Sequence, residues 1–289
     1  MHKVDNAVIL AAGTSSRFAP LSYEMPKGLI SVRGEVLIER QIRQLKEVGI
    51  DQIVVVTGYL KEQFEYLAKE YGVILINNDE YCTRNNNSSI WAARDYLRNS
   101  YICSSDNYFT SNPFESAVED AYYSAIYSEG YTKEWCLRVD DDGNINKVSI
   151  GGRDAWYMLG QVFWTREFSA QFLRILEAEY DLPATRDKLW ESIFMEHLDT
   201  LKMKVRKYKA DSIFEFDTLD ELREFDPTFC KHSGSRIMEE VAETLGGTEA
   251  EISGIEVIKG PDGEAAGFSF LFKSEQYQYR YKTKKLNRC

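Results

Sequence analysis

The chain has 289 residues, of which 44% are hydrophobic, and a formal net charge of −11. This apolar content suffices for a sizeable core and excludes a disordered chain, while the negative charge disfavours nucleic acid and anionic membranes as partners. No apolar run approaches the ~20 residues that a membrane span requires, and the N-terminal residues lack a signal-peptide pattern. The 5 cysteines are scattered without metal-ligand spacing, which indicates reduced thiols and a cytoplasmic protein.

The first part of the chain alternates predicted strands and helices. Apolar runs predict strands at residues 6–12, 52–57, 73–77 and 101–104. Helical spacing of apolar residues predicts helices at residues 37–48, 61–71 and 88–97. This alternation favours an α/β fold with a parallel sheet that helices cover on both faces. Ligands of such sheets bind beyond the carboxyl ends of the strands, here in the loops after Ala12 and Ser104.

After about residue 110 the pattern changes to strands that suit antiparallel pairing. These strands are predicted at residues 122–127, 135–139, 144–150 and 158–164. Asp142 and Gly143 predict a hairpin turn, which makes the acidic run at 140–142 a hairpin tip and not a metal site. Helices at 168–180 and 189–198 and strands at 205–208 and 213–216 complete a predicted domain of residues 1–227.

The last stretch of the chain, residues 228–289, reads as a separate appendage. A helix is predicted at residues 235–245, followed by strands at 256–258, 268–273 and 277–281. Aromatic residues alternate along the last two strands, which predicts a hairpin. We therefore expect a small α+β extension after the main domain.

The segment VILAAGTSSRFAPLSYEMPKGL at residues 8–29 is a candidate phosphate site. It matches neither a P-loop nor a dinucleotide fingerprint. Its loop after Ala12 can still offer consecutive backbone N–H groups to phosphate oxygens. Arg17 can form paired hydrogen bonds with phosphates, and Lys27 can place a charge near an α-phosphoryl group. We favour this interpretation over an ordinary loop with two solvated cations.

Two carboxylates follow predicted strands. Asp106 comes after the strand at 101–104, and Asp217 after the strand at 213–216. Magnesium in proteins is held by one or two carboxylates together with substrate phosphates, so this pair is a candidate Mg²⁺ site. Alternatively, Asp106 closes a turn and Asp217 caps the helix that follows. Strand alternation points the neighbouring Glu215 to the opposite face.

Residues 8–29 resemble the signature of nucleotidyltransferases that join a nucleoside triphosphate to a phosphorylated small molecule, including sugar-1-phosphate nucleotidylyltransferases. The resemblance continues in GYLKEQFEYL (58–67), NNNSSIWAARDYL (85–97), SSDNYF (104–109), KEWCL (133–137) and SIFEFDTLDEL (212–222). Over about residues 4–226 the chain is most similar to bacterial CTP:phosphocholine cytidylyltransferases. It departs at Ser15, where this family usually has a second glycine, so the turn must suit a residue with a Cβ.

The resemblance implies a Rossmann-like, GT-A-like domain with a nucleotide-binding half at 1–110 and an acceptor-binding half at 111–227. It implies catalytic roles for Lys27 and Arg17 and Mg²⁺ binding by Asp106 and Asp217. The nucleotide-binding residues that it implies are Leu10, Ala11, Ala12, Gly13, Thr14, Ser15, Asn85, Asn87, Ser88 and Asp106. The implied substrates are CTP, preferred to UTP on resemblance alone, and phosphocholine; a homodimer is compatible with it.

For the acceptor, aromatic residues suggest a cage for a quaternary ammonium, because aromatic faces attract cations. The candidates are Trp135, Trp190, Trp156 and the acidic Glu191. The alternative is that these tryptophans fill the core. Phosphoethanolamine, 2-aminoethylphosphonate and a sugar 1-phosphate stay open as acceptors, as does a catalytically silent binding protein. The appendage resembles the opening strands of a choline-kinase-like lobe without its catalytic loop, so a working kinase is excluded.

Overall fold

The computed structural model describes residues 1–261 and 265–289. The described chain forms two compact units, and each unit joins stretches that are distant in sequence. The first unit comprises Met1–Gly13 and Leu37–Glu215, and the second comprises Thr14–Val36 and Phe216–Cys289. The predicted boundary after residue 227 divides the chain into two consecutive segments and not into these interleaved units, and it stays a prediction.

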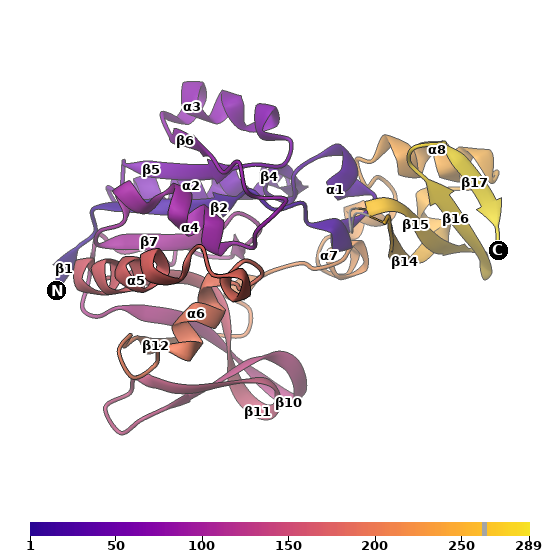
Figure 1. Ribbon diagram of the computed structural model, residues 1–289. Helices are drawn as coiled ribbons and strands as arrows, with labels where there is room; N and C mark the ends of the chain where they lie inside the picture. The colour runs from indigo at the N-terminus through magenta and orange to yellow at the C-terminus, as the bar shows by residue number, and fades with distance from the viewer. Residues whose placement is uncertain (262–264) are drawn as a thin grey trace. The chain divides into compact units, whose positions relative to one another are not determined.

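A seven-stranded sheet in the order β12-β10-β11-β7-β2-β5-β6 forms the centre of the first unit (Figure 1). Its parallel part consists of β2 (Asn6–Ala11), β5 (Ile53–Thr57), β6 (Ile74–Asn77) and β7 (Ser100–Ser104). These four strands match the predicted ones within a few residues. The expected mostly parallel α/β fold is thus confirmed.

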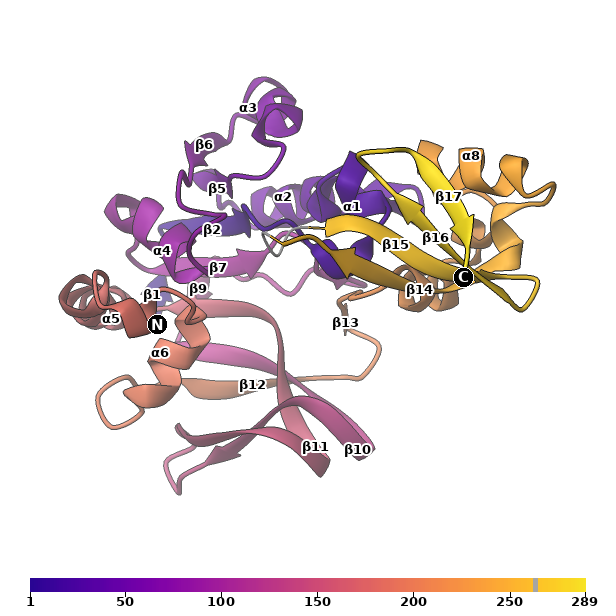
Figure 2. The same cartoon turned by 45° about the vertical axis from the view of Figure 1, so that its right-hand side comes forward.

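The antiparallel part of this sheet corrects the prediction of four short strands. It consists of two long strands, β10 (Tyr122–Val139) and β11 (Ile145–Trp164), with β12 (Lys204–Tyr208) parallel to β10 (Figure 2). Register shifts interrupt the pairing of β10 and β11. The prediction had placed breaks between strands at the polar segments of these two long strands. The predicted turn is confirmed, because the Gly143 N–H donates to the Asp140 carbonyl at 2.9 Å.

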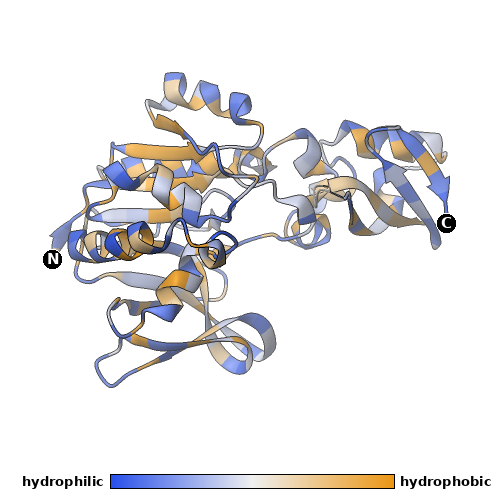
Figure 3. Ribbon diagram, in the orientation of Figure 1, coloured by the Kyte–Doolittle hydropathy of each residue, from blue (hydrophilic) through white to orange (hydrophobic). Residues whose placement is uncertain are grey.

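Helices cover both faces of the sheet. They are α2 (Leu37–Glu47), α3 (Glu65–Tyr71), α4 (Asn87–Ala92), α5 (Arg166–Glu179) and α6 (Trp190–Glu196). One buried cluster joins Val8 and Val54 of the strands to residues of α4, α5 and α6. Helix α2 buries Ile38 and Ile42 outside that cluster. Figure 3 shows the apolar character of the central strands that these helices cover.

Short elements complete the first unit. Strands β1 (His2–Lys3) and β9 (Ala117–Val118) pair, as do β8 (Tyr108–Phe109) and β13 (Ile213–Phe214). The 3₁₀ helices of this unit are η3 (Lys61–Phe64), η4 (Arg94–Tyr96) and η5 (Pro183–Thr185). Within the described residues, no helix has the length and apolar content needed to cross a membrane.

The second unit combines an early loop with the end of the chain. Residues 14–36 form η1 (Ser16–Phe18), α1 (Leu21–Glu24), η2 (Lys27–Leu29) and the paired strands β3 (Ser31–Val32) and β4 (Glu35–Val36). The later stretch contains α7 (Leu219–Phe225), η6 (Pro227–Cys230), α8 (Arg236–Thr244) and η7 (Glu249–Glu251).

An antiparallel four-stranded sheet ends the second unit (Figure 2). Its strands are β14 (Ile252–Lys259), β15 (Ala265–Phe272), β16 (Glu275–Arg280) and β17 (Lys285–Arg288). The helix and hairpin predicted for the appendage are present, and β17 is an additional strand. Alternate residues such as Phe268, Phe270 and Tyr279 are buried, as the aromatic pattern indicated. The likeness to a choline-kinase lobe stays a prediction.

Candidate active site

In the first unit, the loop after β2 and the turn after β7 lie at the same edge of the sheet. The two strands are parallel neighbours with Leu10 opposite Ser104, and the Ser105 N–H donates to the Leu10 carbonyl at 3.1 Å. Residues 11–13 and Asp106 therefore leave the sheet side by side, as expected for a ligand-binding edge. Asp106 is half-buried in that turn.

Neither the backbone conformation at position 13 nor the neighbouring protein atoms require a glycine there. Its φ is not in the left-handed region, and a Cβ added to it would meet no atom within 4 Å. The exposed backbone of Gly13 thus borders open space. A residue without a side chain at this position leaves room for a ligand to approach the backbone.

Ser15 takes the left-handed backbone conformation, with φ 47° and ψ 42°. Glycine adopts this conformation without steric cost, whereas a residue with a Cβ loses roughly 1–2 kcal/mol there. The Phe18 N–H donates to the Ser15 carbonyl at 2.8 Å and closes the turn. The substitution of serine for the family's usual glycine therefore retains a left-handed turn, at a cost in strain.

Three of the predicted functional side chains belong to the second unit. Arg17 forms an ion pair with Asp217 at 2.8 Å, and its side chain is 70% exposed. Lys27 is only 6% exposed, with its ammonium 5.6 Å from the centre of the Phe18 ring. Burial of a lysine ammonium costs free energy, so this position of Lys27 is that of a residue held in place by its surroundings.

The alternative role of Asp217 as a helix cap is wrong. Helix α7 has Thr218 as its N-cap, whose Oγ1 accepts from the Glu221 N–H at 3.2 Å. The Asp217 N–H donates in turn to the Glu221 carboxylate at 2.6 Å. The Asp217 carboxylate is therefore not used in capping and is directed at Arg17.

The asparagine and serine residues before α4 contact protein atoms. Asn85 donates to the Asp187 carbonyl at 3.1 Å, and Asn87 donates to the Thr185 carbonyl at 3.0 Å. Ser88 is buried, and its Oγ donates to the Asn85 carbonyl at 2.8 Å. The N-cap residue of α4, Asn86, forms no side-chain capping hydrogen bond. These contacts tie α4 to the segment before α6, and a nucleotide contact stays a prediction for all three residues.

The acidic candidate of the acceptor half, Glu191, lies on α6 in a polar and aromatic environment. Its carboxylate accepts from the Asn86 amide at 3.1 Å and is hydrogen-bonded to the Tyr123 hydroxyl. Burial raises the pKa of Glu191 to about 7, although both of these hydrogen bonds act in the opposite direction. The Trp190 N–H donates to the Asn86 Oδ1 at 2.7 Å, which fixes the start of the helix.

The three predicted cage tryptophans differ in their surroundings. Trp190 is 2% exposed and packs against Tyr123, Trp164 and Phe172, so its position is that of a core residue. The Lys207 ammonium lies 4.8 Å from the centre of the Trp156 ring, so a cation already covers it. Trp135 is half-buried on β10 and packs beside the core. Contact with an acceptor stays a prediction for all three tryptophans.

Glu215 is a residue that the sequence analysis set aside. Asn107, which follows Asp106, donates to the Glu215 carboxylate at 3.2 Å. After burial and Glu191, the charge of Glu215 contributes to the raised pKa of Tyr123. The expectation of opposite faces was wrong, because residues two apart in a strand, such as Glu215 and Asp217, share a face, and β13 in any case ends at Phe214. The segment FEFD at residues 214–217, with acidic residues at 215 and 217, was the sequence feature that could have pointed to Glu215.

One further group of side chains in the described residues has the arrangement of a metal site: Glu179, Glu196 and His197. The His197 Nε2 lies 2.9 Å from Glu179, and Lys188 pairs with Glu196 at 2.5 Å. The Lys188 ammonium thus already provides the Glu196 carboxylate with the positive charge that a bound metal ion would provide. These contacts give His197 a structural role between α5 and the end of α6.

Comparisons with known proteins identify the family. Residues 7–116 match the model of the MobA-like NTP transferase domain. The choline-phosphate cytidylyltransferase of Streptococcus pneumoniae is 33% identical over 76% of this chain and 96% of its own length. The 2-aminoethylphosphonate cytidylyltransferase of Lancefieldella rimae is 36% identical over 76% of this chain and 92% of its own.

Solved structures agree with these matches. The CTP:phosphocholine cytidylyltransferase of S. pneumoniae superimposes with a TM-score of 0.75 and 33% identity, over 78% of this chain and 99% of that one. An inositol-1-phosphate CTP transferase of T. maritima, with a TM-score of 0.58 and 17% identity, shares the fold alone. The chain belongs to the nucleotidyltransferase family that contains the bacterial choline-phosphate cytidylyltransferases.

Proposed function

We propose that this chain transfers CMP from CTP to phosphocholine and releases pyrophosphate. The observation that carries the proposal is 33% identity to a choline-phosphate cytidylyltransferase over 96% of that protein's length. A second relative with this name, from Haemophilus influenzae, is 33% identical over 94% of its length. The buried acidic group near aromatic residues in the acceptor half supports a cationic acceptor.

The proposed reaction is an in-line displacement at phosphorus. An oxygen of the acceptor phosphate forms a bond to the α-phosphorus of CTP, and the bond from that phosphorus to the pyrophosphate oxygen breaks. The acceptor phosphate has a second pKa near ~6, so it is mostly dianionic at neutral pH and needs no general base. The protein contributes positioning and neutralisation of charge.

The cations of the second unit suit this task. We assign Lys27 to the charge on the α-phosphoryl oxygens, and Arg17 with the backbone N–H groups of residues 11–15 to the departing phosphates. Because Arg17 is paired with Asp217 in the protein alone, a bound triphosphate competes with that carboxylate for the guanidinium. The open space beside Gly13 supports a close approach of phosphate to the backbone.

The carboxylates of Asp106 and Asp217 provide the oxygen ligands that Mg²⁺ prefers. Bound Mg²⁺ would supply positive charge to the phosphate oxygens of CTP. In the protein alone the Asp217 carboxylate is paired with Arg17 at 2.8 Å, so Mg²⁺ would have to displace that guanidinium, which the phosphates of CTP attract in turn.

For the acceptor, we assign the ammonium of phosphocholine to Glu191 and Trp135. A buried carboxylate attracts a cation more strongly than an exposed one, because water screens it less. A second candidate acceptor is 2-aminoethylphosphonate, which the 36% identical relative favours by its name. Its primary ammonium can donate hydrogen bonds to a carboxylate, whereas the quaternary ammonium of choline cannot.

A pyrophosphate-release assay tests the proposal. CTP and UTP are each combined with phosphocholine, phosphoethanolamine, 2-aminoethylphosphonate and glucose 1-phosphate. We expect the highest kcat/KM with CTP and phosphocholine. Preference for 2-aminoethylphosphonate would favour the second candidate, turnover of the sugar alone would overturn a cationic acceptor, and no turnover with any pair would indicate a silent binding protein.

A further inference from the structure

The appendage, residues 228–289, shares a compact unit with the loop that carries Arg17 and Lys27. The match with the S. pneumoniae relative spans 96% of that protein but 76% of this chain. About a quarter of this chain therefore has no counterpart there. The appendage, 62 of the 289 residues, is close in size to that unmatched part.

Two side chains of helix α1, which lies between Arg17 and Lys27, contact the appendage. The rings of Tyr23 and Tyr281 are stacked, with centroids 3.8 Å apart and planes at 11°. The neighbouring Glu24 accepts a hydrogen bond from the Ser235 hydroxyl, at the N-cap of α8. The 3₁₀ helix η1, which contains Arg17, packs against β14.

Helix α7, which follows Asp217, is also tied to the appendage. The Arg223 guanidinium donates to the carbonyls of Ile252 at 2.6 Å, Glu249 at 3.1 Å and Phe229 at 3.4 Å. Its side chain is only 9% exposed. The appendage thereby holds the helix behind Asp217 as well as the loop with the two cations.

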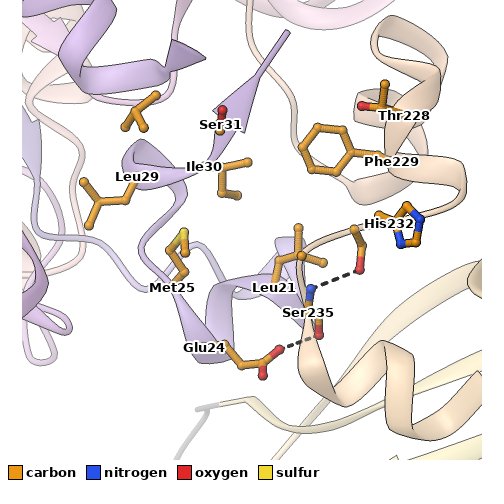
Figure 4. Close-up of a pocket in the computed structure, with 13 residues that line it drawn as sticks. Leu21, Glu24, Met25, Leu29, Ile30, Ser31, Thr228, Phe229, His232 and Ser235 are labelled. Atoms are coloured by element: carbon orange, nitrogen blue, oxygen red, sulfur yellow. Dashed lines mark hydrogen bonds between the residues drawn. The ribbon is translucent and has the colours of Figure 1, made fainter. Parts of the chain in front are cut away.

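A cavity of about 450 Å³ separates parts of the loop from the appendage (Figure 4). Leu21, Met25 and Leu29 line it from the loop, and Phe229 and His232 line it from the appendage. Close packing is therefore interrupted here. The contacts that hold the loop therefore lie around this gap, and they include the Tyr23–Tyr281 stack, the Glu24–Ser235 hydrogen bond and the hydrogen bond from the Arg33 N–H to the Asp226 carboxylate.

We infer that the appendage is a positioning element for the reaction, with Tyr281 as the positioning residue that fixes helix α1 and with it the loop from Arg17 to Lys27. This inference depends on the proposed function for its effect on turnover. It gives residues 228–289 a role in the cytidylyl transfer in place of any phosphotransferase activity of their own.

The test uses the full chain with Tyr23→Ala. Tyr23 is 44% exposed, so its truncation removes the stack with little loss of core packing. We expect kcat for CTP and its best acceptor to fall about three- to tenfold, with KM for the acceptor unchanged. Tyr23→Phe, which keeps the stacked ring, should restore kcat. Leu271→Ala is the matched control, because Leu271 is 40% exposed on β15 of the same unit.

Amide hydrogen exchange provides a second readout that does not depend on activity. Residues 14–36 should exchange faster in Tyr23→Ala than in the wild type and in Leu271→Ala. An active wild type with unchanged kcat in Tyr23→Ala would overturn the inference, as would unchanged exchange in that loop. A wild type that turns over no acceptor would instead refute the proposed function, and the exchange experiment would still decide whether the appendage positions the loop.

Discussion

The two units of this protein are built in different ways. The first has a seven-stranded sheet with a shared apolar cluster, and its span of residues 1–215 is interrupted by residues 14–36 alone. The second joins residues 14–36 to residues 216–289, largely through side-chain contacts such as Tyr23–Tyr281 and Arg33–Asp226. Asp106 and Glu191 belong to the unit with the central sheet, the first in the turn after β7 and the second on α6, while the cations Arg17 and Lys27 belong to the second unit. The central sheet and the two cations assigned to charge neutralisation thus belong to units that are stabilised in different ways.

The largest effect should come from the second unit, with Lys27→Met. This change removes the charge assigned to the α-phosphoryl group and keeps much of the side-chain volume at a site that is 6% exposed. We expect kcat to fall about 10²–10³-fold. Steady-state kinetics give the value, and a thermal melt should show an intact fold. A fall of less than threefold would remove Lys27 from the reaction.

Asp106→Asn makes the corresponding test in the first unit. The amide keeps the shape of the side chain but loses the charge that attracts Mg²⁺. We expect kcat to fall about 10²-fold and the Mg²⁺ concentration for half-maximal rate to rise. Asn107→Ala, which leaves the carboxylate in place, is the neighbouring control. If Asp106→Asn responded to Mg²⁺ like the wild type, Asp106 would not be a metal ligand.

Glu191→Gln should have a smaller effect, on KM for phosphocholine. With its pKa raised to about 7, Glu191 is largely neutral below that pH and ionised above it. KM in the wild type should therefore fall as the pH rises from 6 to 8. At pH 8 the KM of the glutamine variant should be about tenfold higher than that of the wild type, and it should change less with pH. The acceptor phosphate also titrates in this range, so the two proteins are compared at each pH.

The same pKa makes a prediction about stability. Because the folded-state pKa lies above the ordinary value of 4.5, the folded protein binds more protons than the unfolded chain between these two pH values. Stability of the wild type should thus decline as the pH rises from 4.5 to 7 and not decline further from this group above pH 7. Denaturant unfolding should show a smaller decline in Glu191→Gln. An identical profile would contradict the burial of this carboxyl.

The smallest effect is expected for Trp156→Ala. Lys207 already covers this ring, so the tryptophan contributes little to binding a second cation. KM for phosphocholine should change by less than about twofold, whereas Trp135→Ala should raise it several-fold, since cation–π contacts contribute ~0.5–2 kcal/mol. The reverse ranking in parallel assays would place the acceptor against Trp156.

The sequence predicted the first unit better than the second. Apolar runs located β2, β5, β6 and β7, because a buried parallel strand needs a continuous apolar segment. The polar middle segments of β10 and β11 face solvent, so one long hairpin resembled four strands. Among the site residues, sequence motifs indicated Arg17 and Asp217 separately, and in the structure the two side chains form an ion pair.

The association of residues 14–36 with the appendage had no signal in the sequence. The contact between Tyr23 and Tyr281 joins positions at opposite ends of the chain, and no periodic pattern encodes such a pair. Glu215 was missed for a local reason, since residues two apart in a strand share a face and alternation therefore gives no ground for separating it from Asp217. Patterns of period two or 3.6 predict elements, whereas contacts between distant segments depend on how those elements pack.

Ser15 has a consequence for how the nucleotide loop meets its ligand. A glycine at this position samples many conformations when the loop opens, and each binding event must then restrict it. Serine samples fewer, which lowers the conformational entropy of the unfolded chain. At the left-handed bend of Ser15 glycine is the unstrained residue, so a Ser15→Gly variant loses strain in the folded loop while its unfolded chain gains entropy, and these two effects on stability oppose each other.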